Sequence, residues 1–124
     1  MSAPEFFEIA DGHMAFRPVG HVWLNQAVQM VVSAIAFARE QKTRNLMTNL
    51  IGLTGFASPS VTARYQLIKE GAQASGGAVR LAMVIRPEIM DPGKIGVLVS
   101  KHLGLVCDVF LTEPEALAWL RSLG

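Results

Sequence analysis

Short apolar runs alternate along this chain with segments in which apolar side chains recur every three or four positions, and this alternation constrains the fold most. The strand-like runs cover residues 6–9, 14–19, 46–51, 79–85 and 105–111. The helical segments follow from residue 24 onward, one after each run except the first. This alternation predicts one domain over residues 1–124, an α/β fold of order ββαβαβαβα, with a mixed but mostly parallel sheet flanked by helices.

Local turn and cap signals predict where the elements begin and end. Ala-Asp-Gly at residues 10–12 predicts a hairpin turn between the first two strands. A capping residue followed by proline is typical of a helix start. The N–H groups of the first turn have no partner within the helix, so proline, which lacks an N–H, is tolerated there. The expected helix caps are Ser58 before Pro59, Asp91 before Pro92, and Thr112 with Glu115 three residues later.

The chain is unusually apolar for its size: 51% of its 124 residues are hydrophobic and only 17% are charged. Two explanations stay open, a sheet buried on both faces or such a sheet together with a subunit interface. The helix expected over residues 24–41 has an apolar arc wider than one core contact needs. Beside the stripe formed by Val28, Val31, Val32 and Ile35 lies a second stripe, which predicts a homodimer interface through Ala27, Met30, Ala34 and Phe37.

Charge and cysteine content argue against several function classes. The formal net charge is only +1 and the cations are dispersed, whereas nucleic-acid binding needs a concentrated basic footprint. The one cysteine, Cys107, lies in an apolar run, which predicts a buried thiol and excludes an internal disulfide. The acidic N-terminus and the short apolar runs predict a cytoplasmic protein without membrane insertion.

The segment after the third strand carries a family resemblance. The run Leu-Met-Thr-Asn at residues 46–49 leads into a Gly/Ser/Thr loop with Ser58 and Ser60 near a helix start. With the element order, this resembles the STAS superfamily, the anti-sigma-factor-antagonist-like domains, and above all its SpoIIAA-like (STAS/SEC14-like) branch, across nearly the whole chain. Regulatory STAS domains typically carry Asp-Ser-Ser-Gly where this chain has Ala57, Ser58, Pro59 and Ser60. The family's phosphorylated serine thus falls on Pro59, which cannot accept phosphate.

Two loops form the candidate binding site. Both follow a parallel strand and precede a helix, so we expect them at one edge of the sheet, where unpaired N–H groups at a helix start favour an anion. Alternatively, Ser58 only caps a helix and the other hydroxyl groups are solvated loop groups. The candidate ligand- or partner-binding residues are Thr54, Ser58, Ser60, Thr62, Arg86 and Lys94.

These residues favour binding over catalysis. No spacing motif supplies a base for a nucleophile, the three histidines are far apart in the sequence, and no metal or cofactor is expected. The first hypothesis is a non-enzymatic regulatory or protein-interaction domain. The alternative is a carrier for a lipid-like or anionic small molecule, which the SEC14 part of the resemblance implies. An enzyme is the third and weakest hypothesis.

Overall fold

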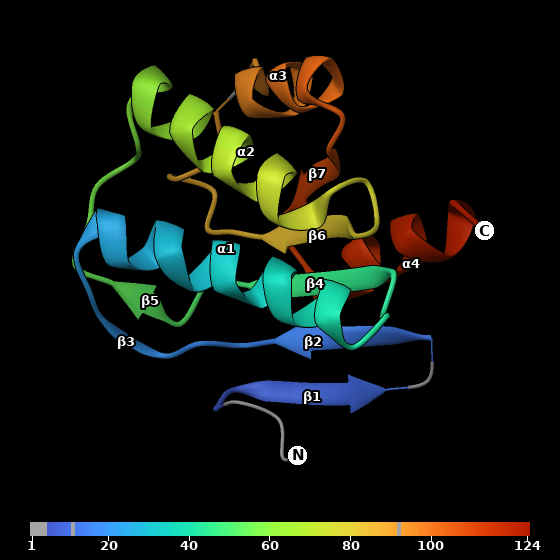
Figure 1. The fold of residues 1–124 in the computed structure, drawn as a ribbon. Helices are drawn as coiled ribbons and strands as arrows, with labels where there is room; N and C mark the ends of the chain where they lie inside the picture. The colour runs from blue at the N-terminus through green and yellow to red at the C-terminus, as the bar shows by residue number, and fades with distance from the viewer. Residues whose placement is uncertain (1–4, 11, 92) are drawn as a thin grey trace.

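The computed structural model describes residues 5–10, 12–91 and 93–124, and its centre is a five-stranded sheet. The strands lie in the order β1-β2-β4-β6-β7 (Figure 1). β1 pairs antiparallel with β2, and every other neighbouring pair is parallel. The strands are β1 (Phe7–Ala10), β2 (His13–Phe16), β4 (Asn45–Asn49), β6 (Arg80–Val84) and β7 (Val106–Phe110). The prediction of a mixed, mostly parallel sheet is therefore confirmed. Asp11 of the expected hairpin turn lies outside the described residues.

Within the described part of the chain, four helices cover this sheet unequally (Figure 1). They are α1 (Leu24–Glu40), α2 (Val61–Ser75), α3 (Ile95–Leu103) and α4 (Glu113–Ser122). Residues of α1, α2 and α3 pack on one face of the sheet, and residues of α4 pack on the other. The flanking helices that the sequence predicts are thus present on both faces.

Burial of both faces explains why the central strands are continuous apolar runs. In β6, Leu81 and Met83 belong to the core beneath α1, α2 and α3. Their neighbours Ala82 and Val84 belong to the core beneath α4. Because successive side chains of a strand point to opposite faces, a strand covered on both sides has no polar face. This geometry accounts for much of the apolar composition.

A second, two-stranded parallel sheet was not predicted from the sequence. It consists of β3 (Gly20–His21) and β5 (Leu53–Thr54), with Gly20 opposite Leu53. Two-residue strands carry no hydrophobic period, so the pattern of the chain could not reveal them. The close approach of the segments that follow β3 and β5 depends on Gly55, because a Cβ at this position would lie 2.6 Å from the carbonyl oxygen of Val22.

The predicted start of α2 was two residues too early. Ser60, and not Ser58, is the N-cap, and its Oγ accepts the N–H of Ala63 at 3.1 Å. The Ser58 hydroxyl instead accepts a hydrogen bond from Nη2 of Arg64 at 2.8 Å, and Nε of Arg64 donates to the carbonyl of Pro59 at 3.1 Å. The Arg64 side chain therefore holds residues 58 and 59 outside the helix.

The predicted start of α3 was also too early, since the helix begins at Ile95. Asp91 still acts as a local cap, because its Oδ2 accepts the N–H of Ile95 at 2.7 Å. Lys94 stands between them in the left-handed region, with φ of 48°. Pro92 lies outside the described residues. For α4 the prediction is confirmed, because Thr112 is the N-cap and accepts the N–H of Glu115 at 3.4 Å.

The wide apolar arc of α1 is largely covered inside the chain. Ala27 and Ala34, expected in a dimer interface, are buried in the single chain, so that part of the interface prediction is wrong. The ring of Phe37 packs edge-on against Phe7 of β1 with centroids 4.9 Å apart, and Met30 also packs against the core. The physical reason is that β1 extends the sheet beneath the helix, which gives the second stripe an intramolecular partner.

Cys107 is buried, as its apolar surroundings in the sequence predict. Burial, with a smaller contribution from the charge of Asp108, raises the pKa of its thiol to about 12.

In the part of the chain that the structure describes, no helix has both the length and the apolar character needed to cross a membrane.

Candidate functional site

The two predicted loops meet at the end of the sheet where β4 and β6 finish, and Arg64 joins them. Arg64 lies in the first turn of α2 and bonds Ser58 and Pro59 of the first loop. Its Nη2 also donates to the carbonyl of Ile89, in the second loop, at 2.9 Å. The loops therefore form one continuous rim, as expected from two parallel strands that end side by side.

A second arginine adds to this junction. Nη2 of Arg86 donates to the carbonyl of Leu53 at 3.1 Å, and its Nε lies 3.6 Å from the carboxylate of Glu88. Arg86 is therefore placed where the sequence predicted a cation near the serine loop. Its charge is partly offset by Glu88, whose side chain is exposed.

Three other predicted residues do not converge on the rim. Nζ of Lys94 is 3.2 Å from the carboxylate of Asp108 in β7, so this cation is paired at another strand. Thr54 belongs to β5 and lies 3.3 Å from a ring nitrogen of His21. Thr62 is exposed on α2. Of the six predicted residues, Ser58, Ser60 and Arg86 thus adjoin the rim, and Thr54 belongs to the neighbouring two-stranded sheet.

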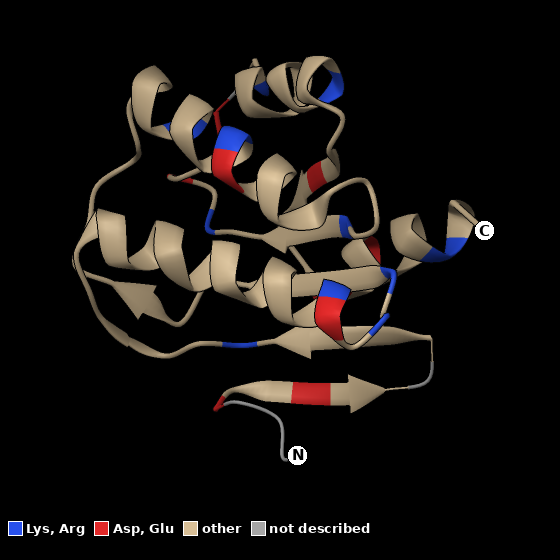
Figure 2. Cartoon of the chain, in the orientation of Figure 1, with Lys and Arg blue, Asp and Glu red and all other residues tan. Residues whose placement is uncertain are grey.

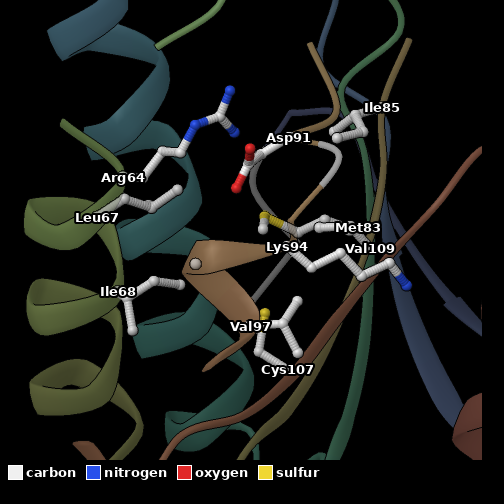
Figure 3. A pocket seen from close by; sticks show the side chains of 11 residues that line it. Arg64, Leu67, Ile68, Met83, Ile85, Asp91, Lys94, Val97, Cys107 and Val109 are labelled. Carbon is white, nitrogen blue, oxygen red and sulfur yellow. The ribbon is translucent and has the colours of Figure 1, made fainter. Parts of the chain in front are cut away.

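Beneath the rim lie two small, adjoining apolar cavities. The larger, of about 90 Å³, is lined by residues of α1, α2, the two loops and the ends of β6 and β7, and it is partly open to solvent. The smaller, of about 50 Å³, continues beneath α2 toward α3. Arg64, Leu67 and Met83 are among the residues that line both (Figure 3). Figure 3 also shows Asp91 beside Arg64 at one end of the smaller cavity, above Ile68, Val97 and Cys107.

The same end of the sheet holds a charge network that sequence reasoning missed. Glu113, the first residue of α4, accepts hydrogen bonds from Nε of Arg17 at 2.8 Å and from Nδ2 of Asn49 at 2.7 Å. The hydrogen bond with Arg17 is the main cause that lowers the pKa of Glu113, and burial opposes it. The side-chain amide of Asn49 joins β4 to α4 through this hydrogen bond.

Figure 2 shows Lys and Arg residues dispersed along the chain among Asp and Glu residues. Within residues 5–10, 12–91 and 93–124, no group of three His, Cys, Asp or Glu side chains has the geometry to hold a metal ion. The rim offers the hydroxyls of Ser58 and Ser60, backbone groups of the two loops, and the guanidinium N–H donors of Arg64 and Arg86. Such groups are suited to recognition of a partner or an anion.

Arg64 is the central residue that the sequence analysis did not single out. One signal was available, because an arginine four residues after Ser60 projects from the same helical turn toward the loop before the helix. Its bond to Ile89 joins residues 25 positions apart, and only the tertiary structure brings them together.

Comparison with known proteins identifies a fold and no family. No protein-family model matches the chain, and no curated protein matches it. Among solved structures, the chain is similar to the NMR structure of the protein TM1081, with a TM-score of 0.51 and 15% sequence identity. The match covers 98% of this chain and 92% of that protein. A likeness at this identity shows that the two share a fold.

Proposed function

We propose that this chain is a non-enzymatic protein-interaction domain of the regulatory, STAS-like kind, which recognises a partner protein through its two-stranded sheet and the adjoining rim. The observation that carries the proposal is a set of exposed side chains on one face of the two-stranded sheet. We name this set the ribbon face; it comprises Val19, His21, Trp23 and Thr54.

The ribbon face follows from the alternation of an extended strand. Val19, His21 and Trp23 are exposed, whereas Gly20 and Val22 between them are half-buried. Thr54 of the partner strand lies beside His21, with 3.3 Å between Oγ1 and Nδ1. The face is therefore continuous across both strands.

Large apolar side chains on this face favour a protein partner. Trp23 is 74% exposed and Val19 is 66% exposed. Tryptophan is enriched among the residues that dominate binding energy at protein interfaces, and exposed apolar clusters with a polar rim mark interaction sites. Here the polar rim consists of Ser58, Ser60 and Arg86 from the adjoining loops.

Two backbone contacts brace this face. Gly20 N–H donates to the carbonyl of Gly52 at 3.1 Å, and Val22 N–H donates to the carbonyl of Thr54 at 2.8 Å. A surface braced in this way loses little conformational entropy when a partner binds. The phospho-acceptor position of regulatory STAS domains is Pro59 in this chain, so the proposal assigns recognition to the ribbon face instead of to a phosphorylated serine at that position.

A matched pair of substitutions tests the proposal. Val19→Gln places an amide on the ribbon face, and Val106→Gln makes the same change on β7, at a valine that is 45% exposed. We expect a partner captured by the wild-type chain, once purified, to bind Val19→Gln at least tenfold more weakly and Val106→Gln unchanged, measured by titration calorimetry. Equal affinities of the two variants would contradict the proposed surface.

The emission of Trp23 gives an independent readout. In a Trp119→Phe background, Trp23 is the single tryptophan, and we expect its emission to shift to the blue when a partner covers it. An unshifted spectrum at saturating partner would place the interface elsewhere.

Self-association through Met30 and Phe37 stays a separate prediction. These half-buried residues line an open groove between α1 and β1, together with Phe6 and Phe7. Light scattering across micromolar concentrations tests the homodimer. A mass that stays monomeric would refute it, and Met30→Lys should dissociate a dimer that uses this groove.

A further inference from the structure

The larger cavity beneath the rim has walls that are apolar with one exception. Its lining comes from α1, α2, both loops and the ends of β6 and β7, and Arg64 is the one charged residue among the described residues that form it. Leu24 and Val28 of α1 and Ala63 and Leu67 of α2 are among its lining residues. A single cation beside an apolar cavity is suited to a ligand with one anionic end and an apolar tail.

The hydrogen bonds of Arg64 leave part of its guanidinium available. Nε donates to the carbonyl of Pro59, and Nη2 donates to Ser58 Oγ and to the carbonyl of Ile89. A guanidinium has five N–H donors, and the two on Nη1 have no partner within the described residues. All three of these acceptors are neutral, and no described carboxylate lies within ion-pair distance of Arg64.

The nearby charges favour a monoanion. Lys94 also lines the smaller cavity, but its Nζ lies 3.2 Å from the carboxylate of Asp108, which offsets its positive charge. Asp91 lines the smaller cavity and contributes a negative charge beside Arg64 (Figure 3). A carboxylate with one charge matches one guanidinium, whereas a phosphate dianion would need a second cation.

The volume limits the tail. Cavities of about 90 Å³ and about 50 Å³ adjoin through shared walls. An engineered apolar cavity of roughly 150 Å³ accommodates benzene, so the combined space here suits a group of about six carbons. A long-chain lipid exceeds this space.

We propose that this cleft binds a small monocarboxylate with an apolar tail of about six carbons, its carboxylate on Arg64 and its tail between α1 and α2. This inference goes beyond the proposed function and does not depend on the ribbon face. The carboxylate would occupy the Nη1 donors of Arg64, while Nε and Nη2 keep their hydrogen bonds to the two loops.

The test uses hexanoate, titrated into the full chain and followed by the methyl resonances of Leu67 and Met83. We expect saturable shifts with a dissociation constant at or below about 1 mM, the range open to a ligand of this size. Hexanol retains the tail without the charge, and acetate retains the charge without the tail. Both should bind at least tenfold more weakly than hexanoate. Dodecanoate, whose tail exceeds the cavity, should produce no saturable shift of these methyl resonances.

Three substitutions separate the contributions to binding. Arg64→Gln should weaken hexanoate at least tenfold and leave hexanol unchanged. Ala63→Leu fills the cavity without disturbing the loop contacts of Arg64, so it should abolish the binding of both. Asp91→Asn keeps a capping side chain and removes the negative charge, so it should tighten hexanoate alone.

Several results would overturn the inference. The first is equal affinity for hexanoate and hexanol. The second is an Ala63→Leu variant that binds hexanoate like wild type. The third is no shift of the Leu67 and Met83 methyl resonances at hexanoate concentrations up to 10 times the expected dissociation constant. If Arg64→Gln does not fold, the Ala63→Leu variant and the hexanol comparison still decide the outcome. If the wild-type chain binds its protein partner but does not bind hexanoate, this inference is refuted and the proposed function is not affected.

Discussion

The carboxylate of Glu113 joins the ends of β2 and β4 to the start of α4, and replacing it with glutamine tests how much this network stabilises the fold. Arg17 donates to both carboxylate oxygens, from Nε at 2.8 Å and from Nη2 at 3.0 Å. Asn49 donates from Nδ2 at 2.7 Å. Arg17 also bonds Glu8 of β1 at 2.8 Å. The substitution removes the negative charge and keeps the size of the side chain.

The expected loss is about 1 kcal/mol of unfolding free energy. A hydrogen bond to a charged group contributes roughly 1.5–3 kcal/mol when it is shielded from water. The side chains of Arg17 and Glu113 are 39% and 27% exposed, so solvent screening reduces the value toward that of a surface pair. In a chain of this size, a loss of about 1 kcal/mol lowers Tm by roughly 3–5 °C.

The pH dependence gives the sharper measurement. The folded state lowers the pKa of Glu113, mainly through its hydrogen bonds with Arg17. A carboxylate whose pKa is lower in the folded state stabilises the protein fully above its unfolded-state pKa, and that stabilisation disappears as the pH falls through its folded-state pKa. Urea unfolding of wild type and Glu113→Gln, followed by circular dichroism, should therefore give free energies that differ near neutral pH and converge on acidification.

Glu115→Gln is the matched control. It makes the same charge change in the same first turn of α4, where both acidic residues favour the helix dipole. Glu115 accepts a hydrogen bond from Thr112 and is exposed, so its replacement should cost less than half as much. Equal losses in the two variants, or a Glu113→Gln difference that persists at acidic pH, would refute the role assigned to the network.

Four further predictions concern stability and reactivity. Ser60→Ala should destabilise the chain by about 1 kcal/mol in chemical unfolding, and Ser58→Ala by less, because only Ser60 caps α2; the reverse order would contradict this assignment. Thr48→Val should leave stability unchanged or raise it by up to about 1 kcal/mol, because the buried Thr48 hydroxyl lacks a partner in the described part of the chain; a clear loss would reveal one. Gly55→Ala should lower Tm strongly, costing roughly 2 kcal/mol or more, because φ is 103° and the new Cβ would overlap a carbonyl oxygen; a Tm equal to that of wild type would show that the two-stranded sheet can shift. Cys107, whose thiol pKa is raised to about 12, should react with a disulfide reagent at mildly alkaline pH only after urea unfolding; rapid reaction of the native chain would contradict its burial.

The loop cluster illustrates how far local sequence signals extend. Ser58-Pro59 is a strong helix-start signal in isolation, yet the helix begins after Ser60. Hydrogen bonds from the Arg64 side chain compete with capping by Ser58. They join Arg64 to the Ser58 hydroxyl and to the carbonyl of Ile89 in a distant loop. The Thr112 cap of α4 was predicted correctly because its partner, Glu115, lies within the same turn.

Hydrophobic period alone determined the order of the five long strands and four helices, because burial on both faces of a parallel sheet imposes continuous apolar runs on the strands and striped patterns on the helices. It also indicated that the two loops share an edge. Only the tertiary structure decided that β1 covers the second stripe of α1, that two dipeptides form an additional sheet, and that Arg64 adjoins an apolar cavity. These features depend on contacts between residues far apart in the chain, and such contacts leave no period in the sequence.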